Sequence, residues 1–186
     1  MRRVLTVFGF SCLLASAAHA DHIGLYNDPQ GSCSGMVPAP TPTLNAVYVV
    51  HKQNNGAAAV QFKIQNQSGL FPVSQTSPYD RLGVWDGDWA FDFGGCVAGD
   101  HLVATLNFFW FGTPITGCGQ TLRVVDAPTS AIPGEIVVAD CAFNLETATG
   151  GTFYFEAAPL TCAFDIGCYA TPVQTSTWGA VKALYR

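Results

Sequence analysis

The sequence predicts an all-β fold, a single antiparallel β-sandwich of the Ig-like or jelly-roll-like kind. Apolar and polar residues alternate with the period of a half-buried strand, most clearly at Val60, Phe62 and Ile64. Short segments of this type recur along the chain and are separated by Pro, Gly and Thr, which is typical of sandwiches and barrels. A helical period appears only in the last ten residues.

Two of the expected strands, 46–53 and 57–64, predict a β-hairpin. Asn55-Gly56 lies between them and supplies residues that tolerate the positive φ angles of a tight hairpin turn. Residues 101–111 are apolar on both faces, which predicts a strand covered on both sides near the middle of the domain. Further strands are expected in "TLRVVDA", "GEIVVADC", "AFNLETA" and "GTFYFEA".

The first twenty residues have the pattern of a secretory signal peptide. Arg2 and Arg3 precede an apolar run, and "AHA" forms a cleavage site that ends at Ala20. No later stretch has the length of a transmembrane helix, so we expect a secreted protein, extracellular or periplasmic, without membrane insertion. The expected divisions are a signal peptide (1–20), a β-sandwich domain (21–170), and a linker with a C-terminal tail (171–186).

Six cysteines follow the signal, and an even number in an exported chain predicts three disulfides. They are Cys33, Cys96, Cys118, Cys141, Cys162 and Cys168. Many pairings are open; we favour a small loop closed by Cys162 and Cys168. The other bonds would then be Cys118–Cys141 and Cys33–Cys96. A zinc site is not expected, because no pair has C-x-x-C spacing and no histidine lies near a pair.

The charge balance excludes two classes of partner. Once Arg2 and Arg3 leave with the signal, six basic residues face thirteen acidic ones. Nucleic-acid binding needs a basic surface that neutralises phosphate, and binding to an anionic membrane surface needs the same sign of charge. We therefore expect neither partner.

The stretch "VWDGDWAFDFGGC" at 84–96 holds three aspartates, Asp86, Asp88 and Asp92, in a chain of which only 11% of the residues are charged. Their spacing resembles an acidic calcium loop, but the residues that follow Asp92 offer no side-chain oxygen for a cation. The favoured interpretation is a "DGD" turn followed by the strand "WAFDF". No metal or other cofactor is expected.

Two tryptophans in this stretch give it a second interpretation. Trp85 and Trp89 could stack on sugar rings while Asp86 and Asp88 bind hydroxyl groups. Alternatively the tryptophans belong to the core, where aromatic side chains contribute much of the buried area. Solvent exposure decides between these interpretations, and we favour the core for at least one tryptophan.

Three histidines remain after the signal: His22, His51 and His101. They are far apart in the sequence, so each is interpreted as structural or solvated. A copper enzyme is the alternative. Cleavage after Ala18 would make His19 the N-terminus, and an N-terminal histidine with His101 would form the copper site of a lytic polysaccharide mono-oxygenase. The "AHA" site argues against that cleavage.

The tail begins with a Thr-rich linker and ends in "TWGAVKALYR". Trp178, Val181 and Leu184 or Tyr185 recur at helical spacing, although a strand or an extended segment is also open. The tail is either an address or docking peptide or a cover for an edge or apolar patch of its own domain. The candidate recognition residues are Trp178, Gly179, Lys182, Leu184, Tyr185 and Arg186.

Four segments together, "IGLYNDPQGSC", "VYVVHKQNNGAAAVQFKI", "ATGG" and "TWGAVKALYR", resemble a group of small secreted bacterial β-domain proteins that have no assigned activity. The resemblance covers most of the chain after the signal, and the tail is its most specific part. It implies an exported, disulfide-bearing β domain with a common tail, and it supplies no catalytic residues.

The first functional hypothesis is therefore a secreted, non-enzymatic protein that binds an unknown protein or glycan or contributes to an extracellular structure. The alternative is an extracellular polysaccharide-active enzyme. It would be either the copper mono-oxygenase or a glycosidase with Asp86 and Asp88 as its carboxylate pair.

Overall fold

The computed structural model describes residues 21–38, 41–52, 54–82, 88–112 and 118–156. All regular secondary structure in these ranges is strand, which confirms the all-β class. Among these residues there is no helix with the length and apolar character needed to cross a membrane. The twelve strands are β1 (His22–Tyr26), β2 (Gly35–Met36), β3 (Thr43–Lys52), β4 (Ala57–Asn66), β5 (Phe71–Thr76), β6 (Asp80–Leu82), β7 (Trp89–Val97), β8 (His101–Trp110), β9 (Gln120–Val125), β10 (Ile136–Asp140), β11 (Leu145–Gly150) and β12 (Thr152–Phe155).

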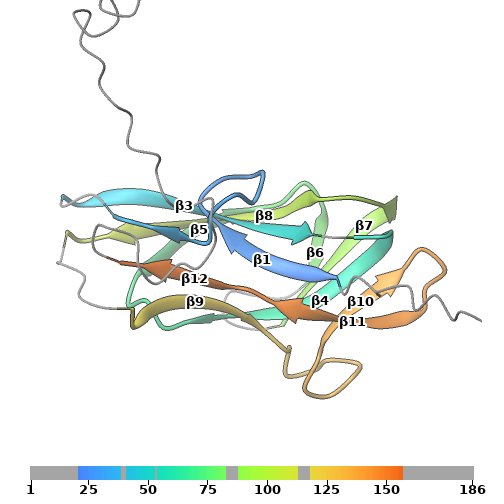
Figure 1. The fold of residues 1–186 in the computed structure, drawn as a ribbon. Coiled ribbons are helices and arrows are strands. Elements are labelled where there is room, and N and C mark those ends of the chain that lie inside the picture. The colour runs from blue at the N-terminus through green and yellow to red at the C-terminus, as the bar shows by residue number, and fades with distance from the viewer. Residues whose placement is uncertain (1–20, 39–40, 53, 83–87, 113–117, 157–186) are drawn as a thin grey trace, which may run out of the picture.

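The strands form two facing layers (Figure 1). The hydrogen-bonded order is β2-β12-β9-β4-β10-β11-β1-β3-β8-β5, with β7 on the other edge of β4 and β6 beyond it. One layer therefore contains β1, β3, β8 and β5, and the other contains β2, β12, β9, β4 and β7. The strands β10 and β11 connect the layers along one side. The choice between Ig-like and jelly-roll-like topology stays a prediction.

The sandwich is mixed rather than antiparallel throughout. β1 pairs in parallel with β11, and β2 pairs in parallel with β12, whereas the other ladders are antiparallel. Both parallel pairings join segments that lie far apart in the sequence. Such pairings leave no local signal, since only tight turns between consecutive strands mark a ladder in the sequence.

The predicted hairpin between 46–53 and 57–64 is wrong. Both strands exist, but β3 pairs with β1 and β8, whereas β4 pairs with β7, β9 and β10. The chain crosses from one layer to the other between them. Asn54 supports the crossing: its Nδ2 donates to the Val97 carbonyl at 2.7 Å, and its Oδ1 accepts from the Gly56 N–H at 2.6 Å.

The strand 101–111 is covered on one face only, which corrects the prediction of two buried faces. Leu106, Phe108 and Trp110 point inward and are at most 6% exposed. On the other face Phe109 is only partly buried, and Phe111, just beyond β8, is 64% exposed. β8 is thus a central strand of its layer, between β3 and β5, with an apolar outer face.

Aromatic side chains fill the space between the layers. Phe62 lies at the centre, with the rings of Trp89 and Phe91 each 5.8 Å from its own. The predicted strand "WAFDF" is confirmed, with Trp89, Phe91 and Phe93 buried and Asp92 exposed. The alternation recognised in the sequence therefore positions the core.

A disulfide joins Cys96 to Cys141, with the Cα atoms 5.0 Å apart. The predicted bonds Cys118–Cys141 and Cys33–Cys96 are therefore wrong. β7 and β10 flank opposite edges of β4 at Ala57, so their ends meet over the start of that strand. Cys33 and Cys118 are also disulfide-bonded.

The total of three disulfides stays a prediction. Cys162 and Cys168, whose bond was expected to close a small loop, lie outside the described residues, as does the whole of the tail 171–186. The described chain contains one complete bond, Cys96–Cys141.

Candidate functional site

The structure describes only part of the stretch 84–96. Trp85 and Asp86 lie outside the described residues. Trp89 is fully buried, with the Arg81 guanidinium 5.5 Å from the centre of its ring. Trp89 therefore belongs to the core and has no free ring face for a sugar.

Asp88 has a structural contact that the sequence did not reveal. One carboxylate oxygen of Asp88 accepts a hydrogen bond from the Thr129 N–H at 3.0 Å and another from the Thr129 hydroxyl. The Thr129 hydroxyl also lies 3.1 Å from the Gln61 amide nitrogen on β4. Through Thr129, Asp88 therefore holds the loop after β9 in place next to β4. Asp92, the third aspartate, accepts from the Gly94 N–H at 2.8 Å.

Two histidines that are fifty residues apart meet in the layer of β3 and β8. His51 pairs directly with His101, and the ring centroids are 5.2 Å apart. His51 is fully buried, and its Nε2 lies 3.4 Å from the Asp21 carboxylate. The ring of His101 packs against Phe93 at 4.9 Å and Tyr79 at 5.8 Å. The spacing of the histidines in the sequence did not reveal this cluster, because the two rings meet only through the pairing of β3 with β8.

The environment of the pair favours neutral rings. Burial, and then the neighbouring His101, lowers the pKa of His51 to about 4. Burial also lowers the pKa of His101. The pKa of Asp21 is raised, first by burial and then by the charge of Glu146. Neither ring nitrogen of His51 has a hydrogen bond with acceptable geometry in the described chain.

The described residues around the histidine pair offer no candidate metal centre. Over the described ranges, no group of three or more His, Cys, Asp and Glu side chains is placed to hold a metal ion. The copper hypothesis requires His19, and the glycosidase hypothesis requires Asp86; both residues lie outside those ranges. The chemistry open to His51 and His101 is the uptake of a proton at low pH.

The outer face of β3, β8 and β5 exposes apolar side chains. Leu44, Phe109 and Phe71 lie in one row across the three strands, because Phe109 pairs with both of the others. Leu44 is 55% exposed and Phe71 is 62% exposed. Phe111 extends the row, with its ring 4.9 Å from that of Phe109. We call Leu44, Phe71, Phe109 and Phe111 the apolar corner.

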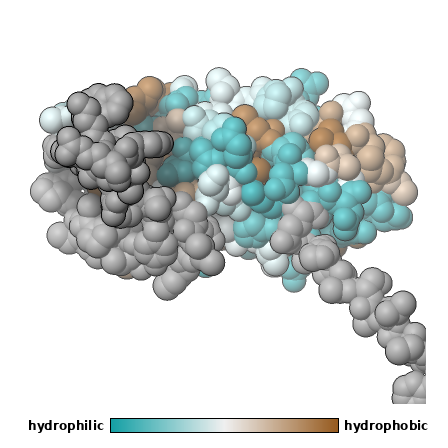
Figure 2. All heavy atoms as spheres, turned by 45° about the horizontal axis from the view of Figure 1, so that its top comes forward, coloured by the Kyte–Doolittle hydropathy of each residue, from teal (hydrophilic) through white to brown (hydrophobic). Residues whose placement is uncertain are grey.

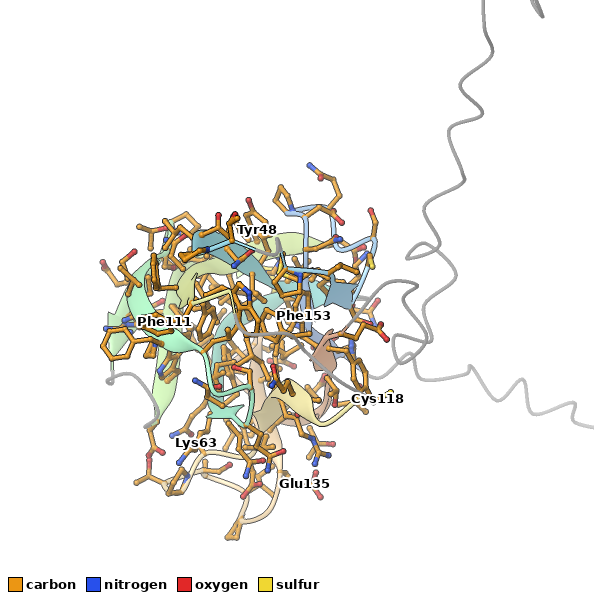
Figure 3. The ribbon with its side chains drawn as sticks, turned by 90° about the vertical axis from the view of Figure 1, so that its left-hand side faces the viewer. Tyr48, Lys63, Phe111, Cys118, Glu135 and Phe153 are labelled. Carbon is orange, nitrogen blue, oxygen red and sulfur yellow. A yellow bond between two sulfur atoms is a disulfide. The ribbon has the colours of Figure 1, made fainter. Side chains whose placement is uncertain are left out.

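The rows next to the apolar corner are polar but uncharged. Asn107 pairs with Ala46 and with Ser74, and its side-chain amide donates to the Ser74 hydroxyl at 3.0 Å. In the following row Thr105 lies between Tyr48 and Thr76. No described residue of these three rows carries a charge. Figure 3 shows Tyr48 and Phe111 at the outside of the molecule and Phe153 between the layers.

The free edge beside this face is protected against further strands. Among the described strands β5 pairs with β8 alone. β5 carries Pro72, which lacks an N–H donor, and its register shifts between Pro72 and Ser74. Proline and irregular register are devices that prevent edge-to-edge pairing. A partner would therefore contact the face rather than extend the sheet.

Figure 2 turns the upper side of Figure 1 toward the viewer and shows hydrophobic residues among hydrophilic ones.

A further exposed aromatic residue, outside the apolar corner, lies at the turn between β10 and β11. Phe143 is 78% exposed and has a positive φ of 63°. Asp140 holds the turn, accepting from the Ala142 N–H at 2.8 Å and the Asn144 N–H at 2.7 Å. The hydrogen bonds from Asn144 lower the pKa of Asp140. This turn exposes a single ring instead of a row.

No known protein family and no curated protein matches the chain. Among solved structures it is similar to several cohesins. A non-cellulosomal cohesin of Archaeoglobus fulgidus has a TM-score of 0.48 and 13% identity, over 74% of this chain and 92% of that one. A cohesin module of a Clostridium perfringens family 33 glycoside hydrolase has a TM-score of 0.48 and 6% identity, over 74% and 96%. The sixth cohesin of Acetivibrio cellulolyticus scaffoldin B, solved with a Cel5 dockerin, has a TM-score of 0.46 and 16% identity, over 74% and 99%. Similarity at this level supports no conclusion about a partner.

Proposed function

We propose that this is an exported, non-enzymatic protein that binds a partner protein through the outer face of β3, β8 and β5. The observation that carries the proposal is the apolar corner, where Leu44, Phe71 and Phe111 are each more than half exposed. Contiguous apolar surface of this kind marks interaction sites, whereas scattered apolar residues do not. Export rests on the predicted signal peptide at 1–20.

The chemistry of the face favours a protein over a glycan. A sugar site needs flat rings together with polar groups that bind hydroxyls, but the apolar corner combines phenylalanines with the aliphatic Leu44 and contains no carboxylate. Protein interfaces have this composition: an apolar, aromatic centre with uncharged polar groups at its rim. Here Asn107 and Thr105 lie in the adjoining rows. Burial of aromatic side chains at the centre of an interface contributes most of its binding energy.

The test is cross-linking and recovery of the protein from its native compartment, with quantitative mass spectrometry. The double variant Phe71→Ser/Phe111→Ser removes two rings of the apolar corner. Phe143→Ser is the matched control, because it removes an exposed ring at a different turn. We expect recovery of one protein partner to fall more than about tenfold in the double variant, which corresponds to about 1.4 kcal/mol.

The control variant is expected to recover the same partner as the unsubstituted protein. Equal recovery by the double variant, with its circular dichroism unchanged, would refute the proposal. Retention on a neutral polysaccharide that the double variant loses would replace the protein partner by a glycan.

A further inference from the structure

The described chain ends directly beneath the apolar corner. β12 runs to Phe155, whose ring lies 6.4 Å from that of Phe108 on β8. Phe108 points into the core, and its neighbour Phe109 points outward from the same strand. β12 of the lower layer in Figure 1 therefore ends at the same end of the molecule as β8, where Phe71 and Phe111 are exposed.

The remaining chain can reach the outer face. Thirty residues follow Glu156, and the stretch 157–177 precedes Trp178. A segment of 21 residues spans at most about 70 Å when fully extended. Facing layers of a sandwich are separated by about 10 Å, so passage around the edge strand β5 needs only part of this length.

The composition of the tail complements the domain. Trp178, Val181 and Leu184 provide apolar side chains at helical spacing, while Lys182 and Arg186 are the only charges of 171–186. Residues 21–156 carry twelve acidic and four basic side chains. An aromatic and basic segment is thus attached to an acidic domain that exposes an apolar row. A second copy of the domain would bring the same negative charge instead.

We propose that residues 171–186 fold back onto the apolar corner of the same molecule and cover Leu44, Phe71, Phe109 and Phe111. This rests on the proposed function, because it assigns to the tail the face that takes the partner. The tail is then a built-in competitor, which a partner must displace before it binds. It also shields the apolar row from non-specific association until the partner is present.

The experiment uses the full-length, oxidised protein with the photoreactive residue benzoylphenylalanine in place of Phe111. A matched protein carries the same residue in place of Phe143. After illumination, peptide mass spectrometry of the monomer fraction identifies the linked segments. We expect a link between position 111 and a peptide of 171–186 at a yield independent of protein concentration, and none from position 143.

A second pair of variants tests the chemistry of the contact. Trp178→Ser/Leu184→Ser is expected to reduce the yield from position 111 severalfold, whereas Gln174→Ser in the linker leaves it unchanged. Absence of any link from position 111 to 171–186, in protein with unchanged circular dichroism, would overturn the proposal. Links found only in dimers would assign the face to a second copy and overturn it too.

The two proposals fail separately. If no tail link forms but Phe71→Ser/Phe111→Ser still loses the partner, the face binds the partner and the tail does not cover it. If the link forms but the double variant keeps the partner, the tail covers a face with no role in partner binding.

Discussion

His51 and His101 lie directly opposite each other on β3 and β8, with their ring centroids 5.2 Å apart and the His51 ring fully buried. A charge on the His51 ring would be buried beside the His101 ring, where burial disfavours the charged form. The titratable groups near the pair include Asp21, His22, Asp100 and Tyr79, and the charge of Glu146 raises the pKa of Asp21. The charge of Asp100 raises the pKa of His51 but does not offset its burial, and that pKa is about 4.

The first prediction concerns pH. The pKa of His51 is about 4 in the folded protein and 6.5 in an exposed chain, so between these values the unfolded state binds more protons. The free energy of unfolding should therefore fall as the pH decreases from 6.5, by about 1 kcal/mol per pH unit near pH 5. Urea unfolding at pH 7.5, 6 and 5 measures it. In His51→Leu this slope should become shallower; an unchanged slope would assign the effect to other groups.

The second prediction concerns Gly56, at the crossing between the layers. Its φ is +135°, and a Cβ atom there would lie 2.7 Å from the Cys141 Sγ. Gly56→Ala should lower the free energy of unfolding by about 2–3 kcal/mol, because it adds a steric clash to an unfavourable backbone angle. Gly69→Ala is the matched control, since its φ is +71° and no atom lies within 4 Å. It should cost only about 1 kcal/mol. Equal losses would show that the disulfide imposes no steric restriction.

The third prediction concerns the disulfide itself. Cys96 and Cys141 are 45 residues apart, so their bond restricts a long loop of the unfolded chain. Cys96→Ala/Cys141→Ala should lower the free energy of unfolding by about 2–4 kcal/mol. Thermal unfolding with and without reductant should show a decrease in Tm for the unsubstituted protein, and a smaller decrease for the variant. A Tm that does not respond to reductant would contradict a stabilising role for the bond.

The fourth prediction separates core from surface in the stretch 84–96. Because Trp89 is fully buried, Trp89→Ala should lower the free energy of unfolding by about 3–5 kcal/mol. Phe143→Ala, at an exposed turn, should change it by less than about 0.5 kcal/mol. Chemical denaturation of both variants is the measurement. A stable Trp89→Ala protein that lost only carbohydrate binding would restore the sugar platform.

Local patterns in the sequence were sufficient for the class of fold and for several strands. The alternation around Phe62 and from Trp89 to Phe93 identified strands and their buried faces, because successive side chains of a strand point to opposite sides. The core was expected for at least one of Trp85 and Trp89, and the structure shows that Trp89 is fully buried. The sequence also drew attention to Asp88, but nothing in it indicated the hydrogen bonds to Thr129.

The sequence pattern did not predict which strands pair, because pairing joins residues that are distant along the chain. Asn55-Gly56 indicated a turn, yet a turn does not specify whether the strands beside it pair with each other or enter opposite layers. The same non-local choice brought Cys96 to Cys141 and His51 to His101, and it aligned Leu44, Phe109 and Phe71 in one row. The alternation of buried and exposed side chains follows from the local geometry of a strand, so it can be recognised in the sequence. The disulfide, the histidine pair and the apolar corner form only when distant strands pair and the two layers assemble.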